Sequence, residues 1–150
     1  MCKRLFLAFA LLFLGCSEES PWIHNDFDPS NIIGEWSVVR IKLNGSIFLE
    51  ESKENNPIIR IKFQDRATFT GQTSKNFFKG TYQSKTDLLL VTDFSTSEVL
   101  DTDFGNKFYM VFEGAFNNMT NRQEFEYIFS TQGLLVKSNV GDELLLRIID

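Results

Sequence analysis

Cysteine and histidine are nearly absent from this 150-residue sequence. The cysteines are Cys2 and Cys16, and the single histidine is His24. All three come before residue 32, where the pattern of a folded domain begins. That domain therefore contains no disulfide and no thiolate ligand. It also lacks the histidine of a nucleophilic dyad or of a histidine-rich zinc site, which excludes both kinds of centre.

Positive charge is also scarce. The 15 Lys and Arg residues stand against 20 Asp and Glu, which gives a formal net charge of −5. Nucleic-acid binding needs a basic surface that neutralises phosphates, so we expect no nucleic-acid partner. Attraction to anionic lipid headgroups is disfavoured for the same reason. No glycine-rich phosphate loop precedes a helix, and we expect no cofactor.

The apolar run over residues 5–14 is shorter than the roughly 20 residues that a membrane-spanning helix needs. It follows Lys3 and Arg4 and has the length of a signal-peptide core. Gly15 and Cys16 come directly after it. This arrangement resembles the signal of bacterial lipoproteins, which are cleaved before a cysteine whose thiol is acylated. The resemblance implies a signal peptide ending at Gly15 and a lipid anchor, palmitate included, at Cys16. An ordinary signal peptide and an uncleaved anchor are the alternatives.

The segment after this cysteine is polar. We expect residues 16–31 to be a lipidated tether, with the folded domain covering residues 32–150. Ser17, Glu18 and Glu19 resemble the acidic signal that sends some lipoproteins to the outer face of the outer membrane. We therefore expect attachment to the outer membrane through the lipid anchor, on its periplasmic or cell-surface side.

From residue 32 onward, apolar and polar residues alternate with the period of β-strands. Asn44-Gly45 predicts a tight hairpin turn, and a break in the alternation near Val38 predicts a bulge. Residues 94–101 read as irregular. The expected strands are 34–43, 47–50, 58–63, 67–71, 76–83, 88–92, 124–130, 134–140 and 143–149.

Residues 103–119 have a different period. Apolar side chains recur there at helical spacing from Phe104 to Met119, and Thr102 or Asp103 can cap the first turn. The helix is expected to end near residues 117–121. The predicted fold class is mainly β (α+β): a small antiparallel β-barrel or curled sheet with one packed α-helix near 103–119.

Several motifs follow one another in a familiar order within this domain. They are Phe69-Thr70-Gly71, the run from Asn76 to Tyr82 that includes Gly80, Leu88-Leu89-Leu90, and Thr96 before the helix and closing strands. This order resembles the META/HslJ domain family over about residues 32–149. The resemblance implies a fold and an envelope or secreted location, without an established reaction.

The sequence departs from that family in two places. Ser74-Lys75 stands where Gly-Cys is usual, and the family's second cysteine, near Leu100, is missing. A disulfide or redox role is therefore not transferred. A second resemblance is that of Gly34-x-Trp36 to the first strand of lipocalins. We favour the META-like fold, because a late helix followed by strands differs from an eight-stranded up-and-down barrel whose helix follows the last strand.

These two resemblances supply five candidate residues. Asn76 and Tyr82 either hold a turn and a strand in place or line a recognition surface. The five family-signature residues are Trp36, Gly71, Asn76, Gly80 and Tyr82.

Catalytic and metal-binding candidates are few. Glu124 and Glu126 share one face of a strand about 7 Å apart, a separation at which paired carboxylates hydrolyse glycosides. Phe125 points the other way, so these acids are expected to face solvent. Asp101-x-Asp103 faintly resembles a calcium loop, but capping of the helix is the better explanation. We expect no catalytic residue and no metal site.

The function predicted from the sequence is a membrane-anchored lipoprotein that acts as a non-enzymatic binding or envelope-maintenance module. Its partner is an unidentified protein or small molecule. The alternative is a lipocalin-like carrier that holds a small hydrophobic ligand inside its barrel.

Overall fold

The computed structural model describes residues 29–50 and 59–149. The expected signal peptide, the lipid-bearing Cys16, the acidic residues Ser17, Glu18 and Glu19, and the polar loop expected over 51–56 lie outside these residues. The elements are η1 (Pro29–Ile32), β1 (Gly34–Leu43), β2 (Ser46–Leu49), β3 (Arg60–Phe63), β4 (Thr68–Gln72), β5 (Phe77–Lys85), β6 (Leu88–Thr96), α1 (Asp103–Gly114), β7 (Phe116–Asn117), β8 (Arg122–Ser130), β9 (Gly133–Ser138) and β10 (Glu143–Ile148).

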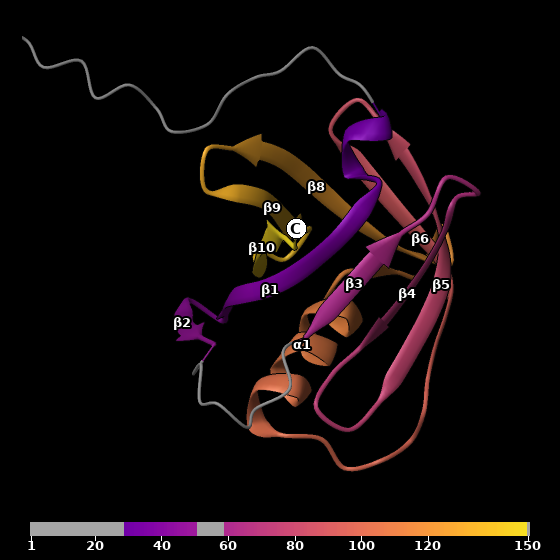
Figure 1. Cartoon of the computed structure of the whole chain (residues 1–150). Coiled ribbons are helices and arrows are strands. Elements are labelled where there is room, and N and C mark those ends of the chain that lie inside the picture. Colours follow the sequence, from indigo (N-terminus) through magenta and orange to yellow (C-terminus); the bar gives the residue numbers. More distant parts are fainter. Residues whose placement is uncertain (1–28, 51–58, 150) are drawn as a thin grey trace, which may run out of the picture.

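Eight strands close into an antiparallel barrel in the order β1-β3-β4-β5-β6-β8-β9-β10, and β10 pairs back with β1. Closure removes the free edges that an open sheet would present. The short strands β2 and β7 lie outside this ring and pair with β1 and β8. In Figure 1 the strands surround one interior, with α1 at one end and η1 at the other. The predicted barrel with one packed helix is confirmed.

The order of the strands corrects one step of the sequence argument. Each barrel strand pairs with the next barrel strand along the chain, so the barrel is of the up-and-down type. Its helix lies between β6 and β8 rather than after the last strand. We expected the late helix to argue against an up-and-down barrel, and this expectation was wrong.

The turn and the bulge predicted for the first strands are confirmed. Asn44 and Gly45 form the turn between β1 and β2 with positive φ angles of 50° and 80°. The expected bulge lies between Val38 and Arg40, where the register with β10 shifts. On its other edge β1 pairs with β3 before the bulge and with β2 after it. The extra residue thus marks the point where one strand changes neighbours.

The helix is shorter than its apolar periodicity predicts. It ends at Gly114, and Ala115 caps it. Phe116 begins β7 and is 39% exposed, and Met119 is 95% exposed, so neither extends the buried face of the helix. The reason is competition for hydrogen bonds: the amide of Glu124 in β8 donates to the carbonyl of Ala115 at 3.0 Å.

Strand β6 is longer than expected and continues to Thr96, into a segment that we predicted to be irregular from Phe94 onward. A register shift between Lys79 and Thr81 of β5, together with a positive φ of 52° at Asp93, marks a bulge that interrupts the alternation. The sequence pattern breaks there, although the pairing resumes beyond the bulge.

Aliphatic and phenylalanine side chains of the described residues fill the interior of the barrel. Ten apolar side chains surround a central space of only about 10 Å³, about the room that one water molecule requires. The helix contributes Phe108, Val111 and Phe112 to this core. Among the described residues, no helix is long and apolar enough to cross a membrane.

Candidate functional site

Trp36 and Tyr82, two of the five candidate residues, each hold a neighbouring segment of chain through a side-chain hydrogen bond. The indole Nε1 of Trp36 donates to the carbonyl of Ile32 at 2.8 Å and ties η1 to β1. The hydroxyl of Tyr82 donates to the carbonyl of Gln64 at 2.9 Å and holds the turn between β3 and β4. Burial, and secondarily the charge of Asp65, raise the pKa of Tyr82. Both side chains are core residues of the barrel.

Gly71 and Gly80 make room for aromatic rings on the inner face of the sheet. Gly71 pairs with Phe78 and Gly80 pairs with Phe69 across β4 and β5. The ring of Phe78 occupies the space that a side chain at position 71 would need, and the Phe69 ring lies 2.7 Å from the ideal Cβ position of residue 80. Aromatic packing over a cross-strand glycine is a known way to fix register.

Asn76 uses its whole amide group to join two segments. Its nitrogen donates to the carbonyl of Val99 at 2.7 Å and to the carboxylate of Asp101 at 2.9 Å. Its oxygen accepts from the amide of Val99 at 2.9 Å and from the hydroxyl of Ser97 at 3.0 Å. The residue is 3% exposed. This network fixes the start of β5 against the segment that leads into α1.

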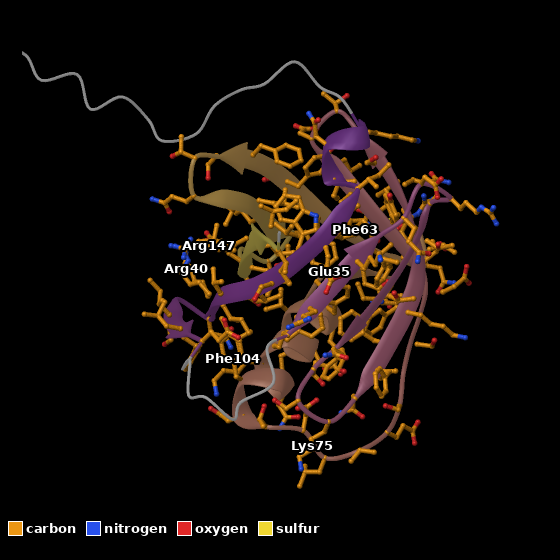
Figure 2. All side chains as sticks on the ribbon, viewed as in Figure 1. Glu35, Arg40, Phe63, Lys75, Phe104 and Arg147 are labelled. Carbon is orange, nitrogen blue, oxygen red and sulfur yellow. The ribbon has the colours of Figure 1, made fainter. Side chains whose placement is uncertain are left out.

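Phe77, the next residue, points outward from this rigid support. The residue is 71% exposed, whereas Phe78 is buried. Its amide donates to the hydroxyl of Ser97 at 3.1 Å, and its carbonyl accepts from the amide of Ser97 at 3.0 Å. The backbone at this position is therefore held on both sides. In Figure 2 the nearby Lys75 marks the same end of the barrel, the end that α1 occupies.

Two shallow depressions flank Phe77 on the outer surface of the barrel. One, of about 420 Å³, is lined by residues of β4, β5 and β6 and by Ser97, which follows β6. The other, of about 290 Å³, is lined by residues of β1, β3, β4 and β5. Both include Thr70, Gly71 and Phe77. We call this surface the Phe77 face, formed by Glu35, Arg60, Lys62, Thr70, Gln72, Phe77, Lys79, Ser95, Thr96 and Ser97.

The strand register arranges the Phe77 face in rows. One row runs across five strands through Glu35, Lys62, Thr70, Lys79 and Ser95. The adjacent row carries the exposed aromatic ring together with a guanidinium and an amide. Those three neighbouring residues are Arg60, Gln72 and Phe77.

Charge on this face is predominantly positive. It holds three cationic side chains and one carboxylate, that of Glu35, which lies 3.6 Å from Arg60. Within 29–50 and 59–149, neither Lys62 nor Lys79 has an acidic side chain at ion-pair distance. Arg40 and Arg147 project from the side of the barrel that carries β1 and β10, away from β4 and β5 (Figure 2).

The acidic candidates lie elsewhere and are occupied by other contacts. Glu124 accepts hydrogen bonds from Thr120 at 2.7 Å and Asn117 at 3.0 Å, and these bonds lower its pKa. A lowered pKa opposes a role as general acid at neutral pH. Glu126 is exposed and pairs in register with Lys137 of β9.

Asp101 and its neighbours form the start of the helix. The hydroxyl of Thr102 accepts from the amide of Gly105 at 3.2 Å, so Thr102 is the N-cap, one of the two predicted. Asp101 accepts from Thr73 and Asn76. In the part of the chain that the structure describes, no three His, Cys, Asp or Glu side chains are grouped closely enough to hold a metal ion.

The hydroxyl of Tyr127 is a buried polar group in the core. The Tyr127 side chain lies within the core, and its oxygen has no well-aligned hydrogen-bond partner among the described residues. Burial, followed by the charge of Asp87, raises the pKa of Tyr127 to about 12, and the Ser84 hydroxyl opposes the shift. The phenol is therefore neutral at physiological pH.

Comparison with known proteins supports the fold alone. No protein-family model and no curated protein matches the sequence. A protein from Burkholderia xenovorans, solved by NMR, superposes with a TM-score of 0.58 at 14% identity, covering 83% of this chain and 90% of its own. The crystal structure of an uncharacterised protein from Bacteroides eggerthii gives 0.49 at 16% identity, covering 78% and 98%. The first likeness supports the barrel and does not distinguish a META/HslJ-like from a lipocalin-like chain.

The sequence argument missed Phe77 as a candidate. The signal was the pair Phe77-Phe78 inside an expected strand, because consecutive strand residues point to opposite faces. One of the two rings had to be exposed. Phe77 shares its strand face with Lys79, and Phe78 shares the opposite face with Gly80. The lysine indicates that the face of Phe77 is the exposed one.

Proposed function

We propose that this protein is a lipid-anchored, non-enzymatic binding module of the bacterial envelope, and that it binds its partner on the outside of the barrel at the Phe77 face. Acylation of Cys16 and export directed by Ser17, Glu18 and Glu19 are part of this proposal. The observation that carries it is the contrast between a filled interior and an exposed aromatic ring between two surface depressions. A META/HslJ-like domain is compatible with this use of a barrel.

The filled interior argues against a site inside the barrel. Pockets for small ligands enclose roughly 300 Å³ or more, whereas the space at the barrel centre is about 10 Å³. Making room would require several buried rings to move. Phe63, Phe69, Phe112 and Phe125 border that space, and close-packed cores resist such displacement.

The exposed ring has the properties of a binding anchor. Aromatic side chains contribute most to recognition when they project from a rigid support into contact with a partner. The hydrogen bonds of Asn76 and Ser97 hold the backbone of Phe77 before any partner arrives, which limits the entropy lost on binding. Leu100 is more exposed, at 86%, but it lies between β6 and α1 rather than on a strand.

The second candidate function is a lipocalin-like carrier. The closed eight-stranded up-and-down barrel supports it, because such barrels hold ligands elsewhere. This alternative requires the interior to open. It predicts saturable binding of a fluorescent fatty acid such as cis-parinaric acid, with quenching of Trp36 in the core.

Co-sedimentation tests the proposed function directly. The full chain carrying Cys16→Ala, which removes the acylation site, is mixed with delipidated, insoluble envelope material and centrifuged. The protein with an unchanged Phe77 face is expected to sediment with the envelope material, whereas the Phe77→Ala variant is expected to stay in solution. Leu100→Ala is the matched control, since it removes an exposed apolar side chain outside the two depressions. Equal sedimentation of both variants would refute the proposed site.

The anchor is tested separately by radiolabelled palmitate. Label is expected in the native chain and absent from Cys16→Ala, and proteolysis of intact cells then reports which side of the outer membrane the domain occupies. Label that persists in Cys16→Ala would contradict lipidation at this residue.

A further inference from the structure

The Phe77 face is locally basic in a protein that is acidic overall. The chain has a formal net charge of −5, whereas this surface carries Arg60, Lys62 and Lys79 against Glu35. Glu35 is paired with Arg60. The two lysines therefore present positive charge that the described residues do not neutralise. A local excess of one charge on a surface of opposite net sign favours a ligand of complementary charge.

The two lysines have a defined spacing. Lys62 and Lys79 both pair with Thr70 and lie on either side of it in the same row. Two strand spacings separate their backbones by about 10 Å. Phe77 precedes Lys79 by two residues on β5, so its ring projects from the same face in the next row. The arrangement is a triangle of one apolar ring and two ammonium groups.

Polar groups surround this triangle. Thr70 and Ser95 bring hydroxyls to the larger depression, and Gln72 brings an amide to the smaller one. The hydroxyls of Thr96 and Ser97, which also line the larger depression, already donate within the protein. Hydroxyls and amides both donate and accept, which suits a ligand with many oxygen atoms. The exposed ring suits a ligand that also has a flat apolar face. A pyranose sugar combines these properties, and an acidic sugar adds the charge.

We infer that the Phe77 face binds an anionic saccharide, one whose rings carry carboxylate or phosphate groups. A sugar ring lies against Phe77, and its acidic groups lie at Lys79 and Lys62. This inference rests on the proposed function and names the class of partner for the same surface.

An extended peptide fits this surface less well. Peptides that bind sheets add a strand to a free edge. Phe77, Lys62 and Lys79 lie on β3 and β5, which pair with a strand on each side, whereas β6 pairs with β8 only from Leu88 to Val91. A peptide added along the rest of β6 would not cover the two lysines. A nucleic acid, which carries one charge per roughly 1.7 Å of duplex, is disfavoured by the net negative charge of the protein. An acidic saccharide carries its charges farther apart along the chain and is repelled less.

Titration calorimetry with defined oligosaccharides tests the inference. The protein is the full chain with Cys16→Ala, and the probes are hexagalacturonate, whose carboxylates stand in for the acidic groups, and the neutral maltohexaose. We expect hexagalacturonate to bind at least about tenfold more tightly than maltohexaose. Phe77→Ala should weaken that binding about tenfold, and Leu100→Ala should leave it unchanged.

Charge is tested by a matched pair of double variants. Lys62→Gln with Lys79→Gln should weaken hexagalacturonate binding about fivefold at low salt and flatten its dependence on salt concentration, since exposed charges are screened within about 10 Å at 0.1 M salt. Lys85→Gln with Lys137→Gln removes the same charge from exposed positions outside this face and should change neither property. Equal effects of the two double variants would overturn the role of Lys62 and Lys79.

The outcomes separate this inference from the proposed function. If neither saccharide binds while sedimentation with the envelope still depends on Phe77, the saccharide assignment is wrong and the binding face stands. If both saccharides bind equally, the acidic part of the assignment is wrong. If sedimentation is also independent of Phe77, both proposals fail.

Discussion

Replacing Asn76 with alanine should destabilise the protein strongly although the residue belongs to no helix or strand. The substitution removes four hydrogen bonds, two donated and two accepted. A typical intramolecular hydrogen bond contributes about 0.5–1.5 kcal/mol, and more when a buried partner is left unpaired. Val99 and Ser97 are exposed enough for water to replace part of the loss. We therefore expect a loss of about 3 kcal/mol in the free energy of unfolding.

Urea denaturation at pH 7 measures this effect. With a slope of about 1.5 kcal/mol per molar urea, a loss of about 3 kcal/mol lowers the midpoint by about 2 M. Hydrogen exchange should also accelerate at the amides of Phe77, Ser97 and Val99, because the network holds that segment. A midpoint shift below about 0.3 M, with exchange unchanged at these amides, would refute the reasoning.

Asn76→Asp is the informative comparison. It keeps the two accepted bonds but replaces both donors with a carboxylate oxygen beside Asp101. Burial and the neighbouring charge should raise the pKa of the introduced group in the folded state above its unfolded value. A raised folded-state pKa means that stability is highest below the unfolded pKa and falls as pH rises through the folded pKa. Asn76→Asp should therefore approach the wild type in acid and resemble Asn76→Ala at pH 7.

Three further predictions concern residues away from Asn76. Gly80→Ala should cost about 1–3 kcal/mol in thermal unfolding, because the new Cβ would lie 2.7 Å from the Phe69 ring and 3.1 Å from the Thr92 carbonyl; an unchanged melting temperature would contradict this. Tyr127→Phe should leave stability unchanged or higher, since it removes a buried hydroxyl without a well-aligned partner, and a clear loss would show that the hydroxyl is paired. The pKa of Glu124, measured by NMR, should lie below the ordinary value of a glutamate side chain, because Thr120 and Asn117 donate hydrogen bonds to it, and should rise in Thr120→Ala. Because this pKa is lowered by folding, the stabilisation that it reports is present above the unfolded pKa and is lost as pH falls through the folded value.

The strands could be predicted because most barrel strands have one face in the core and one in water. Ile61 and Phe63 alternate with Arg60 and Lys62, and the structure buries and exposes them accordingly. The turn at Asn44-Gly45 was equally readable, because both residues take positive φ angles there. Local chemistry is sufficient where it agrees with the tertiary environment.

The ends of α1 and β6 could not be predicted from periodicity. The apolar stripe continues past Gly114 into Phe116 and Met119, but pairing with β8 ends the helix. At β6 the bulge near Asp93 hides a strand that continues to Thr96. In both places a partner distant in the sequence decides the outcome, and a local pattern contains no information about it.

The candidate site was only partly accessible from the sequence. Asn76 was recognised as a family signature, but its contacts with residues 97–101 depend on how the barrel closes. The pairing of Lys62 and Lys79 around Thr70 likewise depends on the register of β3, β4 and β5. The sequence argument missed Phe77, although the alternation in β5 contains its outward direction; its two flanking depressions required the structure.

Mapping of amide chemical shifts by NMR tests most directly whether side chains fill the barrel and whether the protein binds its partner on the outer surface. The labelled full chain with Cys16→Ala is titrated separately with solubilised envelope polysaccharide and with palmitate. Polysaccharide is expected to shift or broaden the amides of Thr70, Phe77 and Lys79, and palmitate to leave the core residues Val91 and Leu144 unchanged. Saturable shifts at Val91 and Leu144 with palmitate, and none at Phe77 with polysaccharide, would contradict the account.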